Sequence, residues 1–251
     1  MSATRALLFA IAMAAAVAAD GEDYTPETYT LELGGARQSV DVYRPLHASS
    51  AGVAIVAHGF GRTRARHRDL GRALAEAGVT AVIPDLPSTV DLWANGRALA
   101  DLARRLERGA IPSLAVGRAH LILMGTSAGG LASLLAAVRL PGLAGWIGLD
   151  PTDRTGSGAA AAAQLAAPAV VMLAEPSLCN LMTSGRSMAE ALPHRWRTVD
   201  VADASHCDFE DPTNNFCRAV CGGSSDATRA AIRAEIVTTA RELLAASDEA
   251  P

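Results

Sequence analysis

The chain has 251 residues, of which 50% are hydrophobic and only 4% aromatic, and its formal net charge is −4 at neutral pH. This length is ample for one domain with a large core. A slightly acidic chain without lysine lacks the basic, aromatic-rich surface of a nucleic-acid-binding protein, so that class of function is excluded.

The N-terminal residues have the pattern of an export signal. Arg5 precedes an apolar stretch at residues 6–17, and small residues at 16–18 are followed by the polar Asp20. A helix needs about 20 apolar residues to cross a bilayer, more than this stretch provides. We therefore expect residues 1–19 to be removed as a signal peptide; a buried N-terminal helix or a retained anchor is the alternative. Residues 20–251 would then form a single secreted or periplasmic domain with no stable membrane insertion.

Short β-like apolar runs alternate with longer helical runs along the rest of the chain. Residues 28–35 and 38–45 alternate apolar with polar side chains on either side of Gly34-Gly35, as in a hairpin. The alternation predicts an α/β fold with a mostly parallel central sheet and helices on both faces. Further strands are expected at 52–59, 79–87, 119–125, 143–150, 168–176 and 196–203, and helices at 66–77, 96–108, 128–140, 158–166 and 226–246, with an unassigned segment around 187–192.

A G-x-S-x-G pattern at residues 125–129 stands between an expected buried strand and a helix. A serine in this setting sits on a sharp turn at the carboxyl edge of the sheet, where its hydroxyl is presented as a nucleophile. The pattern therefore predicts that Ser127 is a nucleophile. The alternative is a loop serine that only caps the helix.

A serine nucleophile needs a histidine base and an acid that orients the histidine. Of the six histidines, only His206 follows the carboxyl end of a strand late in the chain. Three carboxylates follow the serine and precede this histidine at suitable places. Asp150 closes the strand after the nucleophile helix and is favoured, while Glu175, at the end of the next strand, and Asp153 remain as alternatives.

Acyl transfer also needs donors for the developing oxyanion. We expect these to be the backbone N–H groups of Ala128, directly after the serine, and of Phe60, in the glycine-rich loop after an earlier strand. His58, at the start of that loop, is expected to organise it rather than to act as a base.

The four cysteines all lie in the last third of the chain. An even number in an exported chain favours two disulfides over free thiols or metal ligands, and four cysteines allow three pairings. The acidic run at residues 208–211 and the arginine-rich run at 62–68 are both interpreted as solvated loops, rather than as a calcium site and a phosphate-binding patch. The candidates for disulfide bonding are Cys179, Cys207, Cys217 and Cys221.

The segments "VAIVAHGFG", "MGTSAGG", "IGLDPTD" and "ASHCDFED" together resemble the α/β-hydrolase superfamily, over essentially all of the mature chain. Within it they are similar to chlorophyllases, platelet-activating-factor acetylhydrolases and bacterial polyester hydrolases. The resemblance implies an α/β-hydrolase fold, and it favours Asp150 over Glu175 as the acid. It also implies a disulfide near the histidine, which suggests Cys179 with Cys207 and leaves Cys217 with Cys221.

Two departures from these relatives concern the substrate. Thr126 stands where they commonly carry histidine or tryptophan, so we expect a different acyl pocket. Only residues 151–167 separate two consecutive expected strands, which is too little for a cap domain. The cleft is therefore expected to be open.

These observations lead to the expectation of a secreted serine hydrolase, an esterase-like or lipase-like enzyme that cleaves carboxylic esters through an acyl-enzyme. Its ester substrate is the only partner predicted; no metal or organic cofactor is expected, and the oligomeric state is left open. One alternative is a peptidase or amidase with the same triad. The other is a catalytically inactive binding protein on the same scaffold.

Overall fold

The structure is a computed structural model that describes residues 26–46, 50–223 and 225–249. The expected signal peptide at residues 1–19 lies outside the described residues. In the described part of the chain, no helix combines the length and apolar character needed to cross a membrane.

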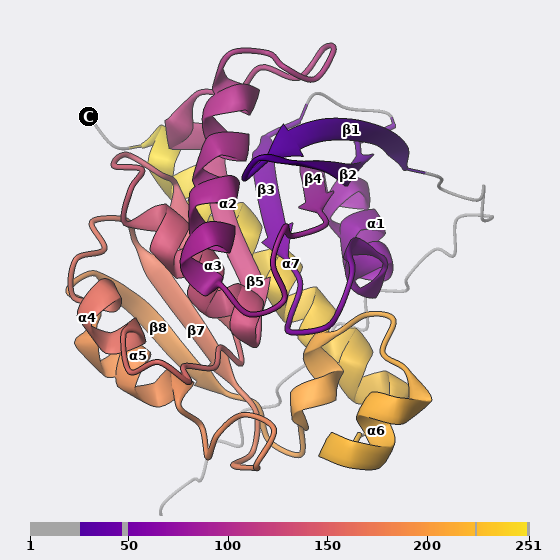
Figure 1. Cartoon of the computed structure of the whole chain (residues 1–251), viewed down its shortest axis with the longest axis vertical. Helices are drawn as coiled ribbons and strands as arrows, with labels where there is room; N and C mark the ends of the chain where they lie inside the picture. The colour runs from indigo at the N-terminus through magenta and orange to yellow at the C-terminus, as the bar shows by residue number, and fades with distance from the viewer. Residues whose placement is uncertain (1–25, 47–49, 224, 250–251) are drawn as a thin grey trace, which may run out of the picture.

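Eight strands form one sheet among the described residues, in the order β1-β2-β4-β3-β5-β6-β7-β8 (Figure 1). The first two are an antiparallel hairpin whose turn is Gly34-Gly35, and both glycines have positive φ, 62° and 82°. β2 is also antiparallel to β4, and the remaining pairs are parallel. The strands are β1 (Glu27–Leu33), β2 (Ala36–Tyr43), β3 (Gly52–Ala57), β4 (Val79–Pro84), β5 (Leu121–Thr126), β6 (Gly145–Leu149), β7 (Ala169–Leu173) and β8 (Arg195–Asp200).

Helices cover both faces of the sheet, as the sequence predicts (Figure 1). The α-helices are α1 (Arg68–Glu76), α2 (Leu92–Glu107), α3 (Ala128–Ala137), α4 (Gly158–Ala162), α5 (Gly185–Ala191), α6 (Asn215–Cys221) and α7 (Asp226–Asp248), and the 3₁₀ helices are η1 (Arg64–His67), η2 (Arg118–His120) and η3 (His206–Phe209). One face packs against α2, α3, α4 and α5, and the other packs against α1 and α7.

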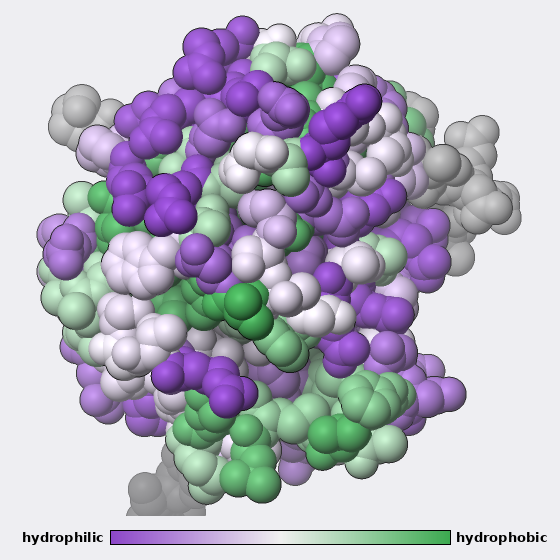
Figure 2. All heavy atoms as spheres, viewed as in Figure 1, coloured by the Kyte–Doolittle hydropathy of each residue, from purple (hydrophilic) through white to green (hydrophobic). Residues whose placement is uncertain are grey.

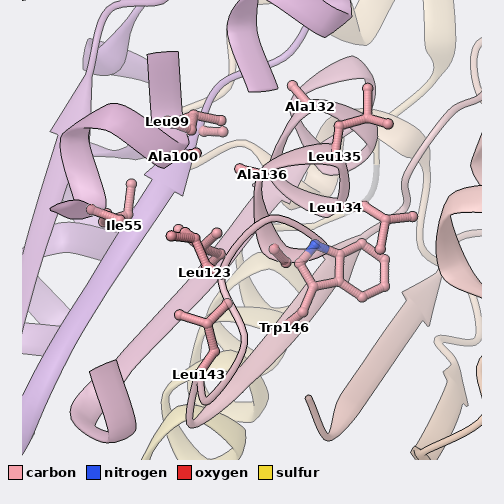
Figure 3. Close-up of a cluster of buried hydrophobic side chains, with 14 of the residues drawn as sticks. Ile55, Leu99, Ala100, Leu123, Ala132, Leu134, Leu135, Ala136, Leu143 and Trp146 are labelled. Carbon is pink, nitrogen blue, oxygen red and sulfur yellow. The ribbon is translucent and has the colours of Figure 1, made fainter. Parts of the chain in front are cut away.

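Alternation along the strands divides the core between these two faces. In β3, Val53 and Ile55 belong to the cluster under α2 and α3, whereas Ala54 and Val56 belong to the cluster under α1 and α7. The first cluster is centred on buried leucines of α3 and β5 and on Trp146 of β6 (Figure 3). The indole nitrogen of Trp146 donates to Ser133 Oγ at 2.9 Å, so its burial leaves no unpaired donor.

Several boundaries differ from the sequence prediction. The helix expected at 66–77 is divided into η1 and α1, the helix expected at 158–166 ends at Ala162, and the unassigned segment around 187–192 is α5. Neither α6 nor η3 was predicted, because both are too short for a helical period to stand out in the sequence.

The disulfide pairing suggested by the resemblance is wrong. The bonds are Cys179–Cys221 and Cys207–Cys217, with Cα atoms 5.6 and 5.9 Å apart. The physical reason is α6, which places Cys217 and Cys221 on consecutive turns. Each of them faces a different neighbouring segment, so the helix is bonded twice to its surroundings.

The acidic run is not a solvated loop, because it packs against α7 and against the arginine-rich run, which itself stays partly exposed. Arg62 Nε donates to Glu210 Oε1 at 2.7 Å, and both side chains are largely buried. Asp208 and Asp211 pair with arginines of α7. Burial raises the pKa of Glu210, although Arg62 opposes this effect. Neighbouring charges therefore hold the segment that contains His206 against the body of the protein.

Candidate active site

Ser127 lies on a sharp turn between β5 and α3. Its backbone has φ 57° and ψ −126°, a conformation that non-glycine residues rarely adopt. Its carbonyl oxygen accepts hydrogen bonds from the N–H groups of Gly130 and Thr152, at 2.9 and 3.1 Å, which hold the turn. A Cβ at Gly129 would lie 2.3 Å from the carbonyl oxygen of His58, so the turn packs directly against the loop after β3.

Three of the predicted site residues are brought together at the carboxyl edge of the sheet. His206 Nε2 lies 2.9 Å from Ser127 Oγ, and His206 Nδ1 lies 2.6 Å from Asp150 Oδ2. They come from three elements: the turn after β5, the residue after β6, and the first residue of η3. A carboxylate accepts a hydrogen bond from Nδ1–H, which leaves the Nε2 lone pair directed at the serine hydroxyl.

Asp150 itself is fully buried and strained. Its exposed fraction is 0%, and its φ is 42°. A buried carboxylate is stable only where donors surround it. Here Oδ1 accepts from the Ala174 N–H at 3.1 Å, and the side-chain amide of Asn180 lies 3.2 Å from Oδ2. Asn180 was missed in the sequence because it lies in an irregular loop, where no period marks a buried polar side chain.

The two alternative acids lie in other arrangements. Glu175 has an exposed side chain, and only its backbone joins the local hydrogen bonds. Asp153 accepts from the N–H groups of Thr155, Gly156 and Gly158 and so closes a turn before α4. Burial tends to raise the pKa of Asp153, but these hydrogen bonds outweigh it and lower the pKa. Neither carboxylate is bonded to His206.

The two expected oxyanion donors line the same cleft beside Ser127. Ala128 is the first residue of α3, and the first N–H groups of a helix have no partner within the helix. Phe60 follows Gly59, whose position is so close that a Cβ there would lie 3.7 Å from Ser127 Oγ. The cleft is lined by Phe60, Ala128, Gly129, Leu86, Ser88, Leu92 and neighbouring loop residues.

His58 holds the Phe60 loop in place. Its Nδ1 bonds the Gly59 carbonyl oxygen at 3.0 Å, and its Nε2 accepts from the Leu86 N–H at 3.0 Å. Burial lowers the pKa of His58, which favours the neutral ring that these two contacts require. The contacts agree with the organising role expected from the sequence.

Two threonines complete the surroundings of the serine. Thr126 is buried, and its hydroxyl donates to the Phe209 carbonyl oxygen at 3.2 Å. It therefore secures the segment after His206, and the different acyl pocket expected from Thr126 stays a prediction. Thr152, which the sequence did not single out, has its hydroxyl 3.4 Å from Ser127 Oγ.

Comparison with solved structures identifies the architecture. A dienelactone hydrolase from Anabaena variabilis superposes with a TM-score of 0.67 at 19% sequence identity, over 85% of this chain and 96% of the other. The chain has the α/β-hydrolase fold. A 2,6-dihydroxy-pseudo-oxynicotine hydrolase superposes with a TM-score of 0.65 at 17% identity, over 90% of this chain and 70% of the other. No protein-family model and no curated protein sequence matches the chain.

Within this fold the candidate residues occupy successive strand ends. The serine turn follows β5, the aspartate follows β6, and the histidine follows β8, in the chain order expected for α/β-hydrolases. Between β6 and β7 the only helix is α4, which has five residues, so nothing in that segment forms a cap.

Proposed function

We propose that the protein is a serine hydrolase that cleaves carboxylic esters outside the cytoplasm. The observation that carries the proposal is the hydrogen-bonded chain from Ser127 through His206 to Asp150. Ser127 and Asp150 both have strained backbones, and such positions cluster at functional sites, where the surrounding fold offsets their cost. A serine that merely caps a helix needs neither the histidine nor the buried carboxylate.

In the proposed mechanism, Ser127 Oγ attacks the ester carbonyl carbon while His206 Nε2 accepts the hydroxyl proton. The same proton passes to the leaving alcohol, which departs as the carbonyl re-forms on an acyl-serine. Water then attacks the acyl-serine with His206 again as the base, and this releases the carboxylic acid and restores the serine. Asp150 keeps Nε2 directed at the serine and stabilises the imidazolium formed in both steps.

The tetrahedral intermediate carries a negative oxygen that needs fixed donors. The N–H groups of Ala128 and Phe60 supply them in this proposal. Their support is the position of both residues in the cleft beside Ser127 and the two hydrogen bonds through which His58 fixes the loop. Removing one such donor typically costs about 10²–10³ in kcat.

Exposed apolar side chains on the two segments joined to the Asn180 and His206 loops favour esters with an apolar group. Leu178 and Met182 lie in the loop before α5, and Phe216 and Val220 lie on one side of α6; all four are more than half exposed. The bond between Cys179 and Cys221 joins the two segments. Apolar surface gathers along the lower edge of the molecule, where α6 and this loop lie (Figure 2). We call these four residues the apolar rim.

Two experiments test the proposal. A fluorophosphonate probe should label the purified protein, and Ser127→Ala should abolish the labelling; an unlabelled native protein would instead support an inactive binding protein. A panel of p-nitrophenyl esters beside aminoacyl anilides then separates the reactions. Turnover of anilides alone would replace the esterase proposal with a peptidase or amidase.

The proposed location outside the cytoplasm has separate support. Two disulfides are typical of proteins that fold in an oxidising compartment. N-terminal sequencing of the protein recovered from culture medium or periplasm should begin near residue 20. Retention of the full chain in the cytoplasm would contradict this part of the proposal.

A further inference from the structure

Asn180 is a buried side-chain amide in a loop, with every hydrogen-bonding position used. Its Oδ1 accepts from the N–H groups of Ser177 and Thr183, at 2.8 and 3.0 Å. Because two N–H donors face that atom, the NH₂ group must point the other way. There it lies 2.9 Å from the Glu175 carbonyl oxygen, and 3.2 and 3.4 Å from the two carboxylate oxygens of Asp150.

The backbone after Asn180 is strained. Leu181, Met182 and Thr183 have φ of 53°, 55° and 61°, three consecutive left-handed residues without a glycine. L-amino acids adopt this conformation as single residues and seldom in runs. The bond from the Thr183 N–H to Asn180 Oδ1 holds the run closed. The loop therefore adopts an unfavourable path that leaves the Asn180 amide facing Asp150.

The disulfides anchor both partners of Asp150 to one helix. Cys179, next to Asn180, is bonded to Cys221 of α6, and Cys207, next to His206, is bonded to Cys217 of the same helix. α6 thus links the segment that donates to Asp150 with the segment that carries the histidine. Among the described residues, His206 is the only basic side chain paired with Asp150, so the carboxylate depends on neutral donors for the rest of its stabilisation.

We propose that Asn180 is a positioning residue that keeps the Asp150 carboxylate turned toward His206. The inference rests on the proposed hydrolase function. The amide contacts both carboxylate oxygens, so it restricts rotation of the carboxylate and leaves Oδ2 in line with His206 Nδ1. Hydrogen-bond donors of this kind fix the orientation of a functional group without taking part in the reaction themselves.

Asn180→Asp removes the amide donor to Asp150 and to the Glu175 carbonyl oxygen, and it keeps the other loop contacts. A carboxylate keeps an acceptor for the Ser177 and Thr183 N–H groups, but it replaces the donor to Asp150 with a second acid. The titratable groups facing the pair are His206 and, beyond it, Glu210. Two carboxylates this close in a buried site compete for one proton, so Asp150 becomes a poorer acceptor for His206 Nδ1–H. We expect kcat to fall by about 10²-fold with KM nearly unchanged, and the acid limb of the kcat/KM profile to shift from its wild-type position.

A double-mutant cycle shows whether Asn180 acts through Asp150. Asn180→Ala should lower kcat strongly in the wild type but by less than twofold when Asp150→Asn is already present. Asn214→Ala is the control: it removes a side-chain cap of α6 but no contact to Asp150, and it should leave the pH profile in place. Thermal unfolding of each variant separates folding from activity, and Asn180→Asp decides if Asn180→Ala does not fold.

The outcomes of the two proposals are distinguishable. If the wild type hydrolyses esters and Asn180→Asp retains its kcat and its pH profile, the positioning role is overturned while the hydrolase proposal stands. If Asn180→Ala lowers kcat equally in the wild type and in Asp150→Asn, the positioning role is overturned as well, since the effect is then purely structural. An unreactive wild type with an unlabelled Ser127 overturns the function on which the inference rests.

Discussion

The Nδ1 atom of His206 lies 2.6 Å from Oδ2 of Asp150, although 56 residues separate them in the chain. Together with the contact between His206 Nε2 and Ser127 Oγ, it connects a buried carboxylate to the serine hydroxyl. It also discriminates between the candidate acids, because the exposed Glu175 side chain has no such contact with the histidine.

Substitution of these residues should therefore have graded effects. We predict that Ser127→Ala lowers kcat by about 10⁶ and Asp150→Asn by about 10⁴, the range known for serine hydrolase triads. Glu175→Gln is the matched control and should remain within about twofold of the wild type. Initial rates on a short-chain p-nitrophenyl ester measure all three. A strongly reduced kcat in Glu175→Gln together with an unchanged kcat in Asp150→Asn would assign the role of acid to Glu175.

The two disulfides should differ in their effect on stability. Cys179–Cys221 closes a loop of 42 residues and Cys207–Cys217 one of 10, and the cost of opening a cross-link rises with loop length. In the loop-entropy model, replacing the first pair with alanines costs about 4 kcal/mol and the second about 3 kcal/mol. Urea unfolding of the two double variants checks the order. Peptide mapping without reduction should also recover Cys179 joined to Cys221, and a Cys179–Cys207 peptide would refute the pairing.

His67 should make the protein less stable in acid. Burial, and then the neighbouring His58, lower the pKa of His67 to about 3. An unfolded chain protonates a histidine near its ordinary pKa of about 6.5, so below that pH protons favour the unfolded state. The stability contributed by the neutral, buried His67 is complete above about pH 6.5 and is lost as the pH falls toward 3. This group alone should lower the free energy of unfolding by about 2 to 3 kcal/mol between pH 7 and pH 4.5.

Urea unfolding at these two pH values measures the effect. His67→Leu should lose less stability than the wild type between pH 7 and pH 4.5. His194→Leu, which changes an exposed histidine, should keep the wild-type dependence. The same slope in His67→Leu as in the wild type would show that His67 does not remain neutral in the folded protein.

The apolar rim should set the preference for acyl length. Phe216→Ser and Leu178→Ser remove exposed apolar surface from α6 and from the loop before α5, and burial of each CH₂ contributes about 0.8 kcal/mol. We predict that kcat/KM for hexanoyl and octanoyl esters falls about three- to tenfold, while kcat/KM for acetyl esters is unchanged. Trp196→Ser is the control, because this exposed side chain lies near the amino end of β8. Equal losses on all chain lengths would indicate that the rim does not contact the acyl group.

The parts of the fold that repeat along the chain could be predicted from the sequence. Apolar runs gave the positions of the strands, and parallel strands bring their carboxyl ends to one edge, so the proximity of Ser127, Asp150 and His206 followed from where each stands relative to a strand. Asn180 could not be found in this way. Its role depends on a loop conformation with three left-handed residues, which no local pattern encodes.

The contacts of the charged runs and the disulfide pairing could not be predicted from local patterns either. A cluster of arginines or acids is normally solvated. Here Arg62 and Glu210, 148 residues apart in the chain, form an ion pair that is largely removed from solvent. The cysteine pairing depended on α6, whose seven residues are too few for a helical period to stand out. Contacts between irregular segments are fixed only when the rest of the chain has folded.

The bond between Cys179 and Cys221 has a consequence for a protein exposed to proteases. Every peptide bond between these two cysteines lies inside a covalent ring, and the ring closed by Cys207–Cys217 is nested within it. A single cut in this region opens a ring without releasing a fragment. The segments that carry Asn180 and His206 therefore stay attached to the protein after one nick, and only a second cut elsewhere in the region can free them.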